Sequence, residues 1–568
     1  MSMLPYPVKG PPTHAGNYLY EDNRIYYRTY GKKLIVCHGQ VWPIFRVIDS
    51  AGNISNVFVF EPANGTPRIV RITAEMSESD SSKIAFTVGV IIFEQRHFAY
   101  CMKEALTLSY IQAQAPLTLV DSKGWFGNGY EAFYTGKKVI CTRDFSKKNY
   151  YFEKHPDTPF QKRGTLPEWQ KYVGVHCQAS PIVLGVTCLS IASILLPLLN
   201  MSSRLVNVYG QKGTGKTIFL QIAATIWGNG IDPAHGATAE VPPFIAKADS
   251  TKCALDIMLS IQSPYPALLD EMTEADIGTL YQMLYQVASG MGKNRAKPNI
   301  TAQVQKTWRL SVVTTSEKSI AEILAKGNKT MLGGQADRAI DVPINASGIF
   351  TDFSGFKDLY DLQDHLKRAT GLYYGTPGEA IIKFIVEHPD KARQVFDLLN
   401  EFENLLLPEG CAPGQRRVIK HFAGGLVAGY LAILAGVLTC TTEDLDQAFK
   451  AITTAWWNAQ KPPCFDSIAD FIEDNADDIS WEAPDLKSHC VAFIFHGLLV
   501  IRADEFERYF AAKYKEMLDQ LYSNQALKRK QLNRNKSRYC NNAMETYDID
   551  LARIAPFLSA ELREALEL

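Results

Sequence analysis

The chain has 568 residues, with 59 Lys and Arg against 60 Asp and Glu, and 46% of its residues are apolar. This profile excludes a disordered chain, a collagen-like repeat and a small disulfide scaffold. At roughly 150 residues per domain, the length predicts three or four domains. The near-zero net charge means that any basic footprint for nucleic acid has to be local.

The 11 cysteines form no C-x-x-C pair, and the opening sequence MSMLPYPVKG has no apolar core of a signal peptide. We therefore expect no zinc site and no redox pair, and a cytoplasmic protein. Two uncharged runs, 181–199 and 422–440, approach the roughly 20 residues that a membrane span needs. Prolines in the first run and the many Gly and Ala residues of the second favour buried core helices and no membrane partner, with membrane spans as the alternative.

Residues 1–175 are predicted to form an N-terminal β-rich domain, because short β-branched and aromatic runs alternate with turn sequences. One helix is predicted over 98–114. We expect the aromatic side chains of this domain to pack within it, and stacking on single-stranded bases is the alternative. They include Tyr18, Tyr20, Tyr26, Tyr27 and Tyr30.

Residues 176–348 alternate strand and helix patterns, which is typical of a parallel α/β domain. Within them, Gly210 to Thr217 reads G-x4-G-K-T, between a predicted strand at 205–209 and a predicted helix at 217–227. Such glycines let backbone N–H groups approach a phosphate at a helix N-terminus. We expect Lys216 to neutralise the β- and γ-phosphates and Thr217 to ligate Mg²⁺. The alternative is a plain glycine-rich turn, and the predicted ATP-binding residues are Gly210, Gly213, Thr214, Gly215, Lys216 and Thr217.

Two further strands are predicted to end in polar residues that complete a hydrolytic site. The strand at 267–270 ends in Asp270 and Glu271, which we expect to hold Mg²⁺ through water and to act as general base, respectively. The strand at 310–313 leads into Thr314, Thr315 and Ser316. We expect Thr315 to orient the attacking water, and the alternative is that these threonines only favour strand geometry.

Two arginines are predicted to act on the phosphates from outside the sheet. Arg338 precedes a predicted strand at 339–343, where it can reach the γ-phosphate of a neighbouring subunit as an arginine finger. A pair with Asp337 or Asp341 is the alternative for Arg338. Residues 349–460 are predicted to form a helical lid, in which Arg417 closes over the phosphates in preference to Arg416.

Two acid-free basic segments are candidates for DNA contacts. Lys293, Arg295 and Lys297 lie on a glycine-flanked tip that would face the channel of a ring, where it can hold phosphates. The alternatives are a solvated loop or residues that reach the next subunit. Residues 461–568 are predicted to form a winged-helix-like domain, with strands at 491–501 and 546–549 and helices at 504–512 and 516–526. Its basic run can bind duplex DNA, dock on a neighbour or remain solvated, and comprises Lys528, Arg529, Lys530, Arg534, Lys536 and Arg538.

Taken together, these motifs resemble the MCM-like, AAA+-related replicative helicases of phages and mobile elements such as staphylococcal cassette chromosomes. The likeness spans about residues 90–460, including Gly124 and Trp125, and its motifs are Gly210 to Thr217, Asp270-Glu271, Gly290 to Lys297, Thr314 to Glu317, Gly333 to Arg338 and Arg417 to Phe422. The resemblance implies a hexameric ring that loads on DNA and unwinds it during replication of the element. The first ninety residues match poorly.

The predicted fold is therefore α/β, with a P-loop AAA+-type ATPase core, an N-terminal β-rich domain, a helical lid and a C-terminal winged-helix-like domain. The predicted function is an ATP- and Mg²⁺-dependent DNA helicase that acts on single-stranded and forked duplex DNA as a homo-oligomeric ring. Two alternatives remain: an AAA+ ATPase that remodels a protein partner, and an ATP-switched origin-binding or defence protein.

Overall fold

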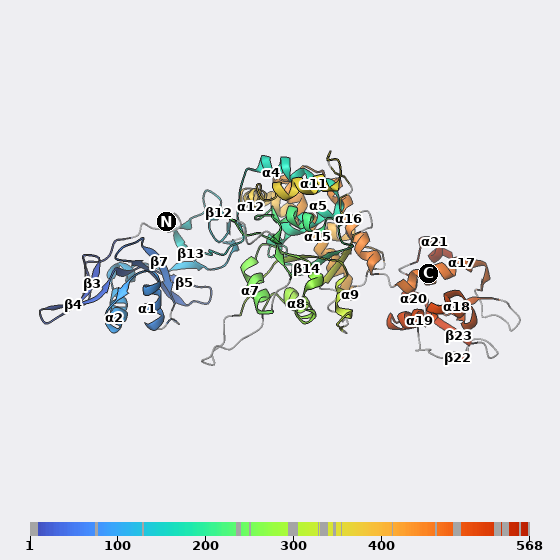
Figure 1. Cartoon of the computed structure of the whole chain (residues 1–568), viewed down its shortest axis with the longest axis horizontal. Helices are drawn as coiled ribbons and strands as arrows, with labels where there is room; N and C mark the ends of the chain where they lie inside the picture. Colours follow the sequence, from blue (N-terminus) through green and yellow to red (C-terminus); the bar gives the residue numbers. More distant parts are fainter. Residues whose placement is uncertain are drawn as a thin grey trace. The chain divides into compact units, whose positions relative to one another are not determined.

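The computed structural model is a mixed α/β structure with five sheets and many helices (Figure 1). It describes residues 9–73, 76, 78–127, 130–234, 240–248, 252–292, 305–327, 329, 339–344, 348–350, 352–353, 355–409, 411, 413–460, 463–480, 490–527, 535–536, 545–555 and 558–565. The chain divides into two compact units. The first comprises Met1–Gln161, Ile261–Pro264 and Glu379–Arg393, and the second Lys162–Ser260, Tyr265–Gly378 and Gln394–Leu568. The predicted borders at 175, 348 and 460 remain predictions.

Three sheets build the first unit. One has the order β1-β2-β3-β4-β8, with β1 His14–Ala15, β2 Tyr18–Glu21, β3 Arg24–Thr29, β4 Lys32–His38 and β8 Ile91–Ile92. A second has the order β13-β9-β5-β6-β7, with β5 Gln40–Ile48, β6 Ile54–Glu61, β7 Arg68–Ile72, β9 Leu117–Val120 and β13 Tyr150–Phe152. The third joins β10 Gly124–Phe126, β11 Ala132–Tyr134 and β12 Val139–Cys141.

Helices pack against these sheets: α1 Glu78–Thr87, α2 Gln95–Ala105 and α3 Ser109–Gln112. The helix predicted over 98–114 is thus two helices, and α2 buries one stripe made by Phe98, Cys101, Met102 and Ala105. This i, i+3, i+4, i+7 spacing explains why the segment is helical, since it presents one apolar face to the core. The core of this unit is rich in aromatic side chains, with Phe58 and Phe60 of β6 almost fully buried.

The tyrosines of the first unit differ in their surroundings. Tyr18 and Tyr20 are buried, and Tyr27 stacks on His97 with ring centroids 4.1 Å apart. The expected packing is therefore confirmed for these three side chains. Tyr30, in contrast, is fully exposed.

A parallel five-stranded sheet forms the centre of the second unit, with the order β15-β16-β17-β14-β18. Its strands are β14 Arg204–Tyr209, β15 Ala246–Lys247, β16 Ala267–Asp270, β17 Ser311–Ser316 and β18 Ala339–Pro343. Helices α7 Lys252–Gln262, α8 Ile277–Ser289 and α9 Ile320–Ala325 cover one face, where Leu269, Leu284 and Val312 share an apolar core (Figure 1). The strands are buried on both faces, which is why they read as near-continuous apolar runs.

The other face is covered by a helical layer that includes α5 Pro181–Ala192, α6 Lys216–Ala224, α15 Pro413–Leu434 and α16 Thr442–Ala459. Glycines allow these helices to approach closely. A Cβ at Gly185 would lie 2.1 Å from Ile452, and one at Gly429 would lie 2.9 Å from Leu445 and 3.0 Å from Cys188. The remaining helices of this unit include α4 Leu166–Tyr172, α11 Leu359–Ala369 and α14 Leu399–Leu406. Helices α12 Thr376–Glu387 and α13 Pro389–Asp397 contain the segment Glu379–Arg393, which belongs to the first unit.

The two apolar runs lie in this layer. Helix α15 is long and apolar enough to cross a membrane, but 72% of its 18-residue apolar window is buried inside the chain. The run at 181–199 is interrupted after α5, and α5 packs against both α15 and α16. This packing agrees with the expectation of core helices.

The C-terminal part of the chain has its own sheet and core. The sheet order is β19-β20-β21-β23-β22, with β19 Ile479–Ser480, β20 Ala492–Phe495, β21 Leu498–Arg502, β22 Asn535–Lys536 and β23 Glu545–Asp550. Its helices are α17 Pro463–Asp474, α18 Ala503–Phe510, α19 Tyr514–Ser523, α20 Leu551–Ile554 and α21 Ala560–Ala565. The single strand predicted over 491–501 is wrong, because His496 and Gly497 adopt positive φ and form the turn of a hairpin.

Candidate nucleotide-binding site

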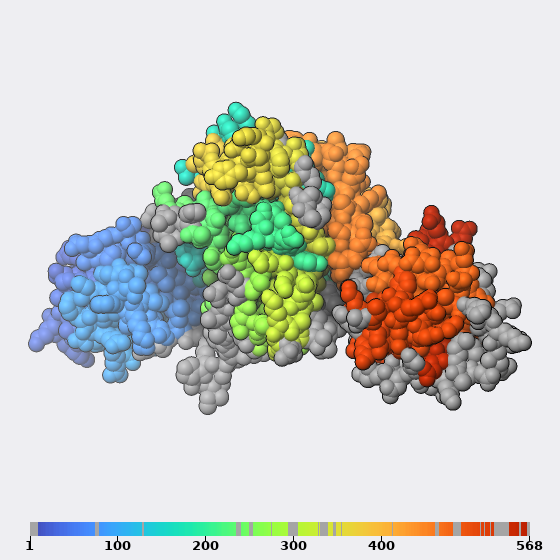
Figure 2. Space-filling view, turned by 45° about the vertical axis from the view of Figure 1, so that its right-hand side comes forward, coloured from blue at the N-terminus to red at the C-terminus, as the bar shows by residue number. Residues whose placement is uncertain are grey.

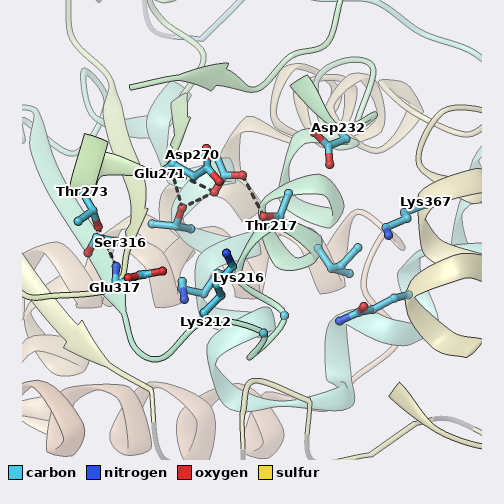
Figure 3. Close-up of a pocket in the computed structure, with 15 residues that line it drawn as sticks. Lys212, Lys216, Thr217, Asp232, Asp270, Glu271, Thr273, Ser316, Glu317 and Lys367 are labelled. Carbon is cyan, nitrogen blue, oxygen red and sulfur yellow. Dashed lines mark hydrogen bonds between the residues drawn. The ribbon is translucent and has the colours of Figure 1, made fainter. Parts of the chain in front are cut away.

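A cleft of about 530 Å³ opens at the carboxyl ends of β14, β16 and β17 (Figure 3). Side chains from separate parts of the chain converge there, as expected where parallel strands end at one edge of a sheet. The lining residues are Lys212, Gly213, Gly215, Lys216, Thr217, Ile218, Asp232, Asp270, Glu271, Thr273, Thr315, Ser316, Glu317, Gln363 and Lys367.

The G-x4-G-K-T segment joins β14 to α6 at the floor of this cleft. Gly213 and Gly215 have φ angles of +84° and +91°, which residues with a Cβ rarely adopt. A Cβ at Gly213 would meet nothing within 4 Å, so that backbone is open toward the cleft. Gly215 is also the N-cap of α6, and the first N–H groups of the helix therefore face the site where an anion would be stabilised.

The ammonium group of Lys216 binds the backbone of its own loop. Its Nζ donates to the carbonyl oxygens of Gly210 at 2.8 Å and Gln211 at 2.7 Å. Burial lowers the pKa of Lys216, and the carboxylates of Glu317 and Asp270 partly oppose this shift. The lysine is therefore held at the loop, where a phosphate would compete with the two carbonyl groups for it.

Asp270 is buried and lies between two hydroxyl groups. Thr217 Oγ1 donates to Asp270 Oδ2 at 2.9 Å, and Thr315 Oγ1 donates to Asp270 Oδ1 (Figure 3). A carboxylate and a hydroxyl in contact beside the loop are oxygen donors of the type that Mg²⁺ prefers. Thr217 and Asp270 are therefore the pair that fits a metal at this site.

Glu271 has a strained backbone and an accessible carboxylate. Its φ of 62° and ψ of 48° place it in the left-handed region, which is uncommon for a residue other than glycine. Its N–H donates to Thr315 Oγ1 at 3.1 Å, and its carboxylate lies 3.7 Å from Lys247 Nζ, with each side chain about half exposed. Strain of this kind is concentrated at functional sites, where the surrounding structure maintains it.

Thr315 therefore adjoins both acids, at 1% exposure. Its hydroxyl group contacts Asp270 and accepts the N–H of Glu271. The water-orienting role predicted for Thr315 remains a prediction.

A polar network buried in the sheet lies behind this edge. Asn207 in β14 accepts from the hydroxyls of Thr314 at 3.0 Å and Ser316 at 2.9 Å, and its Nδ2 donates to Asp341 Oδ1 at 2.7 Å. Asp341 also accepts the N–H of Ile320 at the start of α9. The network thus ties three adjacent strands to the turn that carries Glu317 into the cleft.

Sequence reasoning assigned no role to several residues of the cleft. Glu317 follows β17 directly, its N–H donates to Thr273 Oγ1 at 3.0 Å, and its carboxylate lies near Lys212 and Lys216 (Figure 3). Its position after a strand that ends in hydroxyl residues was a usable signal. Asp232 and Lys367 of α11 lie on the opposite side of the cleft (Figure 3), and Gln363 of α11 also lines the cleft. Their i, i+4 spacing puts Gln363 and Lys367 on one helix face, but nothing in the sequence indicates what that face meets.

Other predicted residues are not brought to the cleft. Arg417 is exposed near the start of α15 and does not line the cleft, and Arg416 forms an ion pair with Glu403. The structure does not test Arg338 or the tip with Lys293, Arg295 and Lys297, which lie outside the described residues. The same holds for Lys528, Arg529, Lys530, Arg534 and Arg538, whereas Lys536 lies in β22.

Among the comparisons with known proteins, one solved structure supports the fold. Residues 70–307 match a domain of unknown function, DUF927, and the curated proteins contain no match. The solved structure of "SCCmec type IV Cch - active helicase" is similar with a TM-score of 0.62 and 17% identity, covering 98% of this chain and 99% of that one. This chain shares the fold of that helicase. The apo structure of the NrS-1 C-terminal region reaches a TM-score of 0.32 at 10% identity, covering 89% of this chain and 96% of that one.

Proposed function

We propose that this protein is an ATP- and Mg²⁺-dependent DNA helicase that acts in replication of a phage or mobile genetic element. The observation that carries the proposal is the cleft in which the glycine loop, Asp270 and Glu271 meet at one edge of a parallel sheet. The likeness in fold to an active helicase over almost the whole length of both chains supports it.

In this proposal the core is a P-loop ATPase of the AAA+ type. The loop from Gly210 to Thr217 holds the nucleotide phosphates, and Lys216 exchanges its carbonyl partners for phosphate oxygens. Thr217 and Asp270 hold Mg²⁺, which neutralises phosphate charge when bound. Glu271 accepts the proton of the attacking water, since its half-exposed carboxylate lines the cleft.

The same proposal assigns the parts that lie outside the cleft. Subunits form a homo-oligomeric ring, and Arg338 of one subunit completes the site of the next as an arginine finger. The tip with Lys293, Arg295 and Lys297 grips a strand of DNA, and the C-terminal winged-helix-like domain with its basic run contacts duplex DNA.

The decisive experiment is unwinding of a fluorescently labelled forked duplex with ATP and Mg²⁺. We expect wild-type protein to separate the strands and Glu271→Gln to bind ATP without unwinding. Triple replacement of Lys293, Arg295 and Lys297 by Ala should keep basal ATP hydrolysis and lose unwinding. ATP hydrolysis that DNA does not stimulate, together with intact forks, would instead favour a remodeller of protein partners. If Glu271→Gln abolishes ATP hydrolysis but leaves the function of the protein intact, an ATP-switched origin-binding or defence protein would be favoured.

A further inference from the structure

The hairpin formed by β3 and β4 extends beyond the sheet that it belongs to. Strand β2 pairs with β3 only as far as Tyr27, and β8 pairs with β4 only at Cys37 and His38. The outer segment, Arg28–Leu34, is therefore a two-stranded ribbon that reaches out from the N-terminal sheet (Figures 1 and 2). We call this segment the basic ribbon. A two-stranded hairpin alone is only marginally stable in water, so unfavourable charge pairs in the ribbon would further destabilise it.

Positive charge is concentrated on the basic ribbon. No Asp or Glu occurs between Asn23 and Ile48, whereas Arg28, Lys32 and Lys33 lie within six positions (28 to 33). Arg28 and Lys33 are directly opposed across the two strands, and like charges in that arrangement are destabilising. Lys33 pairs with Glu21, but both side chains are about half exposed, so this bond contributes little. Among the described residues, the side chains of Arg28 and Lys32 have neither an ion pair nor a hydrogen bond.

An aromatic side chain stands at the tip of the ribbon. Tyr30 has a relative exposure of 107%, and its ring contacts no other ring in the described part of the chain. A Cβ at the neighbouring Gly31 would meet nothing within 4 Å, so the tip is open on that side as well. Tyr30 thus contributes nothing to the core, unlike Tyr18, Tyr20 and Tyr27 of the same unit.

We propose that the basic ribbon is a binding site for single-stranded DNA. Arg28, Lys32 and Lys33 would contact successive phosphates, and Tyr30 would stack on an unpaired base between them. A polyanion also removes the repulsion between Arg28 and Lys33. A membrane surface fits less well, because Tyr30 and Leu34, at 39% exposure, are the exposed large apolar side chains of the ribbon. This site lies in the first unit, needs no nucleotide and does not depend on the ATPase cleft.

The test is the binding of fluorescein-labelled oligo(dT) to the full chain without nucleotide, followed by anisotropy at several salt concentrations. The first variant replaces Arg28, Lys32 and Lys33 by Gln. Its control replaces Lys83, Lys103 and Lys148 by Gln, which removes the same charge from exposed positions of the same unit. Each phosphate contact on a single strand contributes roughly 0.7 to the slope of log K against log salt, so losing three lowers the slope by about 2. If the variant and wild type bind equally at 1 M salt, the variant should bind on the order of 100-fold more weakly than wild type at 0.1 M salt.

A second variant, Tyr30→Ala, should weaken binding on the order of 10-fold and leave the salt slope unchanged, because base stacking is not an ionic contact. If the ribbon variant binds like its control, the ribbon is not the site. If Tyr30→Ala binds like wild type, or if vesicles of phosphatidylserine displace the oligonucleotide, the assignment to single-stranded DNA is wrong. Forked-duplex unwinding is measured in parallel: binding through the ribbon without unwinding contradicts only the proposed function, and unwinding with an inert ribbon contradicts only this proposal.

Discussion

Replacing Glu271 by Asn should separate catalysis from stability, because the residue is strained where it stands. Its backbone is left-handed, with φ 62° and ψ 48°, and asparagine adopts this conformation more readily than glutamate does. The substitution also removes the carboxylate that we propose as the general base. We therefore expect a protein that is about as stable as wild type and that hydrolyses ATP at least 100-fold more slowly.

The magnitude follows from two opposing contributions. Left-handed backbone costs roughly 1–2 kcal/mol for a residue with a Cβ, and asparagine recovers part of this. The lost pair with Lys247 is half exposed at 3.7 Å and contributes about 0–1 kcal/mol. If asparagine recovers about half of the backbone cost, the net change in the free energy of unfolding should lie between about −0.5 and +1 kcal/mol. This corresponds to a melting temperature between about 2 °C below and about 4 °C above that of wild type.

The assay combines phosphate release, binding of a fluorescent ATP analogue and thermal melting of the transition that Mg·ATP raises. The control is Leu269→Ala in β16, the strand that Glu271 follows; Leu269 is 2% exposed, and its truncation should cost about 2–5 kcal/mol. A variant that hydrolyses ATP normally would refute the base assignment. A melting temperature lowered as far as that of Leu269→Ala would show that Glu271 is structural and that the strain argument is wrong.

Three further predictions follow from the contacts around the cleft. Lys216→Ala should weaken ATP binding at least 10-fold in calorimetric titration, because the loop loses its phosphate cation; unchanged affinity would contradict this role. Asn207→Leu should lower the free energy of unfolding by about 2–4 kcal/mol in urea, since Asp341 and the hydroxyls of β17 lose a buried partner; a neutral effect would show that the network contributes little. Burial raises the pKa of Asp341 from 3.8 to about 6 and so favours its protonated form in the fold. The free energy of unfolding of wild type, relative to that of Asp341→Asn, should therefore fall by about 3 kcal/mol as the pH rises from about 4 to about 6. A difference that does not depend on pH would contradict this.

Several parts of the site could be predicted because they are local or follow from the geometry of parallel sheets. A strand, a glycine loop and a helix are encoded within about twenty residues around Lys216, and the observed β14 and α6 match them closely. The residues that end the strands at Asp270 and Thr315 were expected to complete one hydrolytic site, and they do meet, because parallel strands end at the same edge of a sheet. The side chains of Asp270, Thr315 and Thr217 are in fact in hydrogen-bond contact.

Other features depended on contacts between residues that are distant in sequence. The apolar runs at 181–199 and 422–440 gave no indication that α5 and α15 share one layer with α16, since an apolar face does not specify its partner. The contribution of Gln363, Lys367 and Asp232 to the cleft could not be predicted for the same reason, since it arises only from how α11 and the segment after α6 pack. The left-handed backbone of Glu271 was also unpredictable, because local preference opposes it and only the surrounding tertiary structure maintains it.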